Sequence, residues 1–223
     1  MKALLYKEFK LAMHPICYLF VGLFPLMTLI PSYPVAIGFI YILSCYPILF
    51  LGANKGQQSN DLLFSTLLPV RKKDIVLARI ITCSIMQFAF MLLMTALLPL
   101  SLQIHKSVPG DQVPGLGLDA FVSILGIALI GYSIADIIFF AIYYKHGKSI
   151  VMSTLLTILG FIVYLSIFTI ALPYVPGMEW YKSTLSGALW IQFIVLGVAL
   201  IIYVILHFAT YKISSKELEK VDF

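Results

Sequence analysis

The chain has 223 residues, of which 61% are hydrophobic and 11% are charged, and its mean hydropathy is +1.00. Because soluble domains carry about 25% charged residues, this composition excludes a protein surrounded by water alone and indicates one that crosses a membrane several times. The formal net charge of +5 gives no indication of nucleic-acid binding, since it fits the basic loops that set membrane topology.

Residues 1–14 are expected to form an amphipathic helix that lies at the membrane interface, with its three lysines on one side. Glu8 falls within the apolar arc of this helix, where a carboxylate needs a partner. Two interpretations remain open for it. Either the side chain extends to water, or it forms an ion pair with a cytoplasmic base such as Arg79 or with a partner protein.

Six apolar runs are candidates to cross a bilayer, whose hydrocarbon core needs about 20 helical residues. Pro31 and Pro34 divide the first run, which is too long for one helix. We therefore predict a single all-α domain over residues 1–223, a polytopic bundle of six transmembrane helices with a charged tail at 212–223. The predicted spans are about residues 16–31, 35–53, 75–103, 119–144, 149–173 and 184–211.

Lysine and arginine are concentrated on one side of the predicted bundle. Thirteen of these fifteen residues lie in the N-terminal segment, the second and fourth loops and the tail, whereas Lys106 and Lys182 lie on the opposite side. Because loops rich in lysine and arginine stay in the cytoplasm, this distribution predicts that both termini are cytoplasmic.

The longest polar interruption of the sequence spans residues 54–79. A short helix is predicted within it at about 58–68, where Ser59 or Asn60 can cap the start and Pro69 ends it. Its leucines and the charged residues that follow favour contact with a partner at the membrane surface, although the basic residues serve equally well as topology signals. The candidate contact residues are Asp61, Leu62, Leu63, Phe64, Leu67, Leu68, Arg71, Lys72, Lys73 and Asp74.

Asp136 is the acidic residue that we place within the hydrocarbon region. It lies nine residues before Lys145, about 13 Å from the cytoplasmic end of its helix and too far to reach bulk water easily. In a structural interpretation it is protonated, or bonded to a hydroxyl, Gln87 or Gln192. In a functional one it faces a cavity that accepts a cationic cargo. We interpret His207 as an interfacial residue rather than a ligand.

The sequence lacks the minimum parts of common catalytic and metal sites. Its three cysteines have no paired spacing, and it contains no zinc-protease or serine-hydrolase motif. Gly-Lys-Ser at 147–149 is not a phosphate-binding loop, because Ile142 stands where that loop requires glycine. We therefore predict no catalytic residue, no metal ligand and no cofactor bound by this chain.

Taken together, these features resemble the ABC-2 type permeases, the membrane subunits of ABC exporters. The most specific likeness runs from Leu62 to Arg79, where a leucine-rich helix, a Leu-Pro-Val turn, a basic and acidic cluster and an Ile-Val helix start occur together. Lys7-Glu8 also resembles the family's lysine followed by an acidic residue. Within the family, the chain is most similar to the compact permeases of bacterial exporters for phenol-soluble modulins and antimicrobial peptides.

The resemblance implies that residues 58–68 form a coupling helix, which docks in a groove on a separate ABC ATPase subunit while Arg71 to Asp74 contact its rim. That subunit would bind ATP and Mg²⁺, so this chain would not be an enzyme. Two permease copies, identical rather than different, would assemble in the lipid of a bacterial cell membrane and export amphipathic or cationic peptides past Asp136. The alternative is a permease-like sensor or immunity subunit that binds peptide without transporting it.

Overall fold

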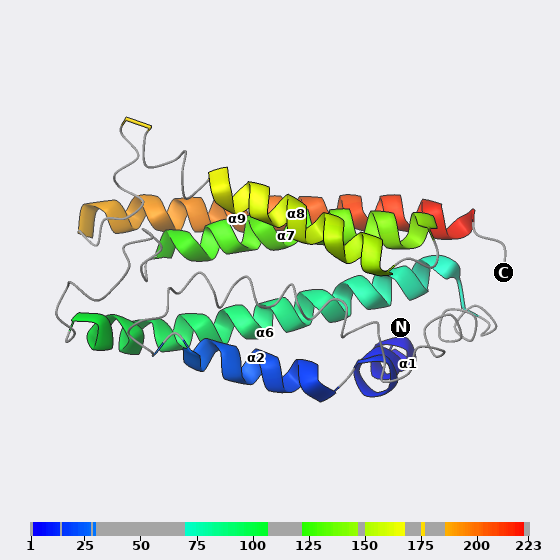
Figure 1. Cartoon of the computed structure of the whole chain (residues 1–223), viewed down its shortest axis with the longest axis horizontal. Coiled ribbons are helices and arrows are strands. Elements are labelled where there is room, and N and C mark those ends of the chain that lie inside the picture. The colour runs from blue at the N-terminus through cyan, green and yellow to red at the C-terminus, as the bar shows by residue number, and fades with distance from the viewer. Residues whose placement is uncertain are drawn as a thin grey trace.

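The computed structural model describes residues 2–13, 15–27, 29, 70–106, 122–146, 150–167, 175–176 and 186–220. All regular structure in these ranges is helical. The elements are α1 (Lys2–Lys7), the π-helical turn η1 (Glu8–Ala12), α2 (Pro15–Met27), α6 (Lys72–Lys106), α7 (Val122–His146), α8 (Ile150–Ser166) and α9 (Ser186–Glu219) (Figure 1).

Within the described residues, three helices are long and apolar enough to cross a membrane: α6, α7 and α9. The number rises to four if the bent pair formed by Lys2–Lys10 and Pro15–Leu26 is one span, and α8 is a shorter apolar helix. These elements overlap five of the six predicted spans. The remaining span, 35–53, and the predicted helix at 58–68 lie outside the described residues. The chain is thus a helical, multi-pass membrane protein.

The N-terminal segment changes direction at a π-helical turn. The backbone N–H of Met13 donates to the carbonyl of Glu8 at 2.9 Å, the five-residue spacing that defines such a turn. Beyond it, α2 is bent by 77° from the preceding helix. This geometry fits the expected order of an interfacial helix followed by a membrane-entering one.

Helix α7 packs closely against α9 and α8. A Cβ atom added at Gly126 would lie 3.5 Å from the Cβ of Ala199 on α9, so the two backbones approach closely there. A Cβ added at Gly131 would come within 2.7 Å of the Phe161 ring and 2.9 Å of the Tyr164 ring on α8. We call α7, α8 and α9 the α7 group.

Helix α6 packs against both the N-terminal elements and α9. It contacts α2, α1 and η1, and it meets α9 more extensively than α7. In Figure 1, α6 and α2 run side by side in a layer separate from α7, α8 and α9. We call α1, η1, α2 and α6 the α6 group. The functional residues described below lie at the junction of the two groups.

The C-terminal helix departs from the prediction. We expected a span ending near residue 211 followed by a solvated helical end. Helix α9 does continue without interruption to Glu219, but part of this end is buried. Ser214 is 0% exposed and Leu218 is 1% exposed, so the first part of the tail packs against the protein. The 34 residues of α9 extend about 51 Å, which is longer than the roughly 30 Å hydrocarbon core of a bilayer.

Candidate functional site

The charged cluster that precedes the third predicted span surrounds the start of α6. This helix begins at Lys72, and Asp74 lies in its first turn, where a carboxylate suits the positive end of the helix dipole. The backbone N–H of Asp74 donates to the carbonyl of Arg71 at 2.9 Å. Lys73 Nζ lies 3.2 Å from Glu219 Oε1, so this end of α6 adjoins the end of α9.

The helical part of the predicted partner-binding surface, at about 58–68, cannot be placed in the same way. Its six residues lie outside the described residues, so their role as a coupling helix stays a prediction. They are Asp61, Leu62, Leu63, Phe64, Leu67 and Leu68.

The structure brings Glu8 and Arg79 together. Arg79 Nε lies 3.3 Å from Glu8 Oε2, and both side chains are nearly completely buried. Arg79 Nη1 also donates to the hydroxyl of Tyr143 on α7 at 3.3 Å. Of the two interpretations of Glu8, the described structure therefore shows the buried ion pair, which ties η1 to α6. We call Glu8, Arg79 and Tyr143 the interface cluster.

Lys7 departs from the prediction that it lies on the polar side of the first helix. It is 9% exposed, and its Nζ lies 3.6 Å from Glu8 Oε1. A buried carboxylate draws cations toward it, because its charge must be compensated where water is excluded. The amphipathic pattern assigns each side chain to a face of the helix by its own polarity alone. It therefore does not predict that Lys7 turns toward the buried Glu8.

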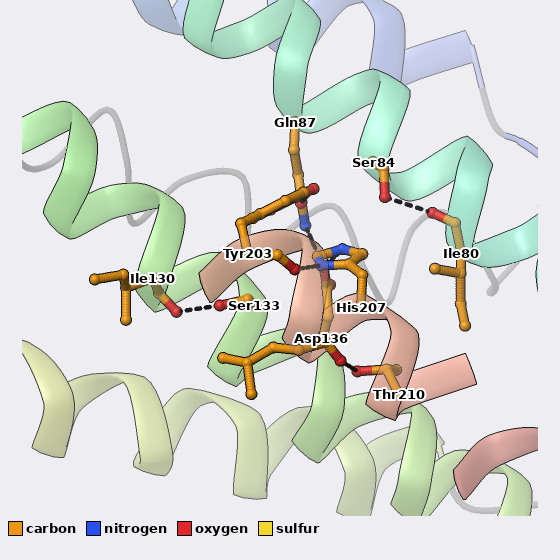
Figure 2. A network of polar contacts seen from close by, with 10 residues as sticks. Ile80, Ser84, Gln87, Ile130, Ser133, Asp136, Tyr203, His207 and Thr210 are labelled. Atoms are coloured by element: carbon orange, nitrogen blue, oxygen red, sulfur yellow. Dashed lines mark hydrogen bonds and ion pairs between the residues drawn. The ribbon is translucent and has the colours of Figure 1, made fainter. Parts of the chain in front are cut away.

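Asp136 lies at the centre of a second cluster, deeper in the bundle (Figure 2). Its side chain is 0% exposed. Gln87 Nε2 donates to Asp136 Oδ1 at 3.1 Å and to Oδ2 at 2.9 Å, and the hydroxyl of Tyr203 donates to Gln87 Oε1 at 2.6 Å. His207 Nε2 lies 2.8 Å from Asp136 Oδ2. We call these four residues the core network.

The core network joins three helices. Gln87 comes from α6, Asp136 from α7, and both Tyr203 and His207 from α9. From the sequence, a hydroxyl, Gln87 or Gln192 was a candidate hydrogen-bond partner of Asp136. The contacts above show the amide of Gln87 in this role. In this conformation the carboxylate does not face an open cavity, because it has no exposed surface and both of its oxygens are engaged.

His207 was misinterpreted as an interfacial residue. Its side chain is 11% exposed, its ring stacks on Tyr203 with centroids 3.9 Å apart, and its Nδ1 lies 3.0 Å from the carbonyl oxygen of Tyr203. A signal for its position does exist in the sequence. Tyr203, His207, Thr210 and Ser214 recur every three or four residues, so polar side chains form one stripe on an otherwise apolar helix.

The Asp136–His207 contact is an ion pair when the imidazole is protonated, because Nε2 lies 2.8 Å from Asp136 Oδ2. An aspartate with an imidazolium is neutral as a whole, which the low dielectric of a membrane interior favours.

The described residues contain no group of three or more histidine, cysteine, aspartate or glutamate side chains that could hold a metal ion. Both clusters instead consist of partners already bonded to one another. Such arrangements position helices and hold protons, whereas hydrolytic chemistry needs an accessible nucleophile or metal-bound water.

Comparison of the sequence with models of known protein families finds a match over most of the chain. The model of the ABC-2 family transporter proteins matches residues 3–215, which include both clusters and every element described above except the first residue of α1 and the end of α9. No curated protein and no solved structure gives a significant match to the chain.

Proposed function

Because this chain belongs to the ABC-2 transporter family, we propose that it is the permease of an exporter for amphipathic or cationic peptides. Membership makes the chain the membrane component of an ABC transporter, which associates with an ABC ATPase subunit and is not itself the ATPase. The family match over residues 3–215 is the observation that carries this conclusion. The cargo, the export direction and the assembly are our proposal.

In the proposed assembly, two identical copies each cross the bacterial cell membrane six times, with both termini in the cytoplasm. Closed two-fold pairs are the commonest symmetric assembly of identical chains. The outward faces of α8 and α9 carry large exposed apolar side chains, such as Val151 at 71% and Trp190 at 75%. Lipid, the second copy, or both would cover these faces.

The proposed coupling runs from residues 58–68 into α6. These residues would dock on the ATPase, which binds ATP and Mg²⁺, and Arg71 to Asp74 would contact the rim of the docking groove. The 35 residues of α6 form one helix of about 52 Å, which is long enough to carry a displacement from the cytoplasmic surface across the bilayer. The ion pair of Arg79 with Glu8 would make the interfacial helix follow this movement.

The position of Asp136 constrains how a cargo could reach it. The aromatic content of 14% suits an amphipathic peptide, and a buried carboxylate suits a cationic one. Asp136 is enclosed by Gln87 and His207 in this conformation. A cationic cargo would therefore contact Asp136 only after one of these partners has moved away.

Transport by inside-out proteoliposomes tests the proposal. The permease and its copurifying ATPase would be reconstituted together, and a fluorescent cationic amphipathic peptide would be added outside. We expect the peptide to accumulate in the lumen with ATP and not with a non-hydrolysable analogue. Peptide binding without ATP-dependent accumulation would contradict export and favour the sensor or immunity function instead.

A further inference from the structure

Polar contacts connect the α6 group to the α7 group at three levels along α6. Near the start of the helix, Lys73 lies 3.2 Å from Glu219 of α9. Further along, Arg79 donates to Tyr143 of α7 at 3.3 Å. Deepest in the bundle, Gln87 donates to Asp136 of α7 at 2.9 Å. The junction between the groups therefore contains interactions that can break and form again, since single hydrogen bonds between membrane helices are individually weak.

The charges in these contacts are distributed unevenly between the two groups. The buried ion pair of Glu8 with Arg79 lies entirely within the α6 group, and that of Asp136 with His207 lies entirely within the α7 group. The partners reached across the junction are neutral in both cases: the hydroxyl of Tyr143 and the amide of Gln87.

The contact near the start of α6 differs from the two deeper contacts in its exposure to water. Lys73 and Glu219 are a charged pair that crosses the junction, but their side chains are 52% and 47% exposed. Water can solvate both charges if the pair opens, so little free energy is lost. The charged pair of Lys73 with Glu219 thus crosses the junction at a place where water is present.

We propose that the α6 group moves as one body against the α7 group, and that it separates at Gln87 while the Asp136–His207 pair stays closed. Separation of a buried ion pair would leave two uncompensated charges, whereas separation here leaves each charge with its own partner. His207 is then a positioning residue that keeps Asp136 compensated when Gln87 withdraws. This inference rests on the proposed function only in naming the ATPase as the source of the movement.

The movement would also control access to Asp136. Gln87 covers both carboxyl oxygens from the α6 side, so its withdrawal would uncover the side of Asp136 that faces away from His207. Tyr203 would release the amide at the same time, because its hydroxyl donates to Gln87 Oε1 at 2.6 Å.

Distances between spin labels in the purified full-length permease test this inference. One pair of labels, at Lys73→Cys and Lys216→Cys, reports the separation of α6 from α9. The matched control pair, at Lys145→Cys and Lys216→Cys, reports α7 against α9 within one group. All three positions lie at exposed or half-exposed side chains, and the three native cysteines would be replaced by serine.

The perturbing variant is Gln87→Leu, compared with Thr95→Val, which removes a hydroxyl bonded only to the carbonyl of Met91 on the same helix. In nanodiscs of phosphatidylethanolamine and phosphatidylglycerol, we expect Gln87→Leu to raise a longer α6–α9 distance about threefold in population, because a hydrogen bond between membrane helices contributes a modest free energy. The α7–α9 distance should stay unchanged, and Thr95→Val should resemble the wild type in both.

An unchanged α6–α9 distribution in Gln87→Leu would overturn the inference, as would equal changes in both label pairs. If Gln87→Leu does not yield folded protein, Tyr203→Phe replaces it, since that change removes the hydroxyl that donates to Gln87 Oε1. It should shift the same distance in the same direction by a smaller amount, and no shift would again overturn the inference. Neither measurement needs the ATPase, so failure here leaves the proposed export function intact.

Discussion

His207 Nε2 lies 2.8 Å from Asp136 Oδ2, where α9 crosses α7 inside the membrane-spanning bundle. The histidine is held in turn by the carbonyl oxygen of Tyr203 at its other ring nitrogen. This relationship explains how a carboxyl group with no exposed surface is accommodated in an apolar region, because the pair as a whole is neutral. Gln87 is the neutral side chain that bonds both carboxyl oxygens from α6.

Removal of one member of the Asp136–His207 pair should lower the free energy of unfolding more than removal of both members does. His207→Leu leaves Asp136 with Gln87 and no cation, and loss of one partner of a buried pair costs about 3–5 kcal/mol. The double variant Asp136→Leu/His207→Leu removes both charges, so we expect it to be more stable than either single variant. Unfolding midpoints in mixed detergent micelles measure this order, and a double variant whose loss equals the sum of the two single losses would contradict the coupling of the pair.

Removal of one member of the Glu8–Arg79 pair should likewise lower the free energy of unfolding. Glu8→Leu leaves a 3% exposed guanidinium without its carboxylate, so a loss of about 3–5 kcal/mol is expected. Lys10→Gln on the same turn is the matched control, because Lys10 is exposed and its Nζ donates to the hydroxyl of Tyr6 at 2.6 Å. Heat-induced aggregation of the purified protein would reveal the difference. Similar midpoints for the two variants would mean that the ion pair does not stabilise the packing of η1 on α6.

Gly131→Ala tests the close packing within the α7 group. The added Cβ would lie 2.7 Å from the Phe161 ring, so the ring must shift, and overpacking of this kind costs about 1–3 kcal/mol. Gly197→Ala on α9 is the matched control, since nothing lies within 4 Å of the Cβ that it adds, and alanine favours a helix over glycine by up to about 1 kcal/mol. We expect opposite changes in unfolding midpoint. Equal changes would contradict the described approach of α8 to α7.

Membrane topology can be measured by labelling single cysteines in intact cells. The basic residues predict that the start of α6 is cytoplasmic and that its far end is outside. A membrane-impermeant maleimide should therefore label Lys106→Cys in intact cells, and Lys72→Cys only after the cells are permeabilised. The reverse pattern would invert the proposed orientation, and labelling of both in intact cells would contradict α6 as a span.

Hydropathy alone was sufficient to locate most of the membrane-spanning helices. The apolar runs at 75–103 and 119–144 correspond to α6 and α7 within a few residues at each end, because a bilayer imposes both the length and the polarity of a span. The partners of Glu8 and Asp136 could also be named in advance. A buried carboxylate in an apolar sequence has few side chains that can compensate it, and Arg79 and Gln87 were among them.

His207 and Lys7 could not be placed because their positions depend on packing between helices. We placed His207 near the cytoplasmic end by assuming that its span ended near 211, whereas α9 continues to Glu219 and carries the histidine opposite Asp136. Lys7 turns inward only because Glu8 is buried beside it. Rotation of a helix and the depth of its neighbour are properties of the assembled bundle, and a single sequence periodicity does not determine them.

The dependence of this permease on a separate ATPase is tested most directly by copurification. Leu63→Asp/Phe64→Asp places two charges on the apolar face of the predicted coupling helix, and Lys55→Asp changes the charge of the same loop outside that helix. We predict that the wild type and Lys55→Asp retain the ATPase, whereas Leu63→Asp/Phe64→Asp loses it at an equal permease level in the membrane. Retention of the ATPase by the double variant would contradict the assignment of residues 58–68 as the coupling helix.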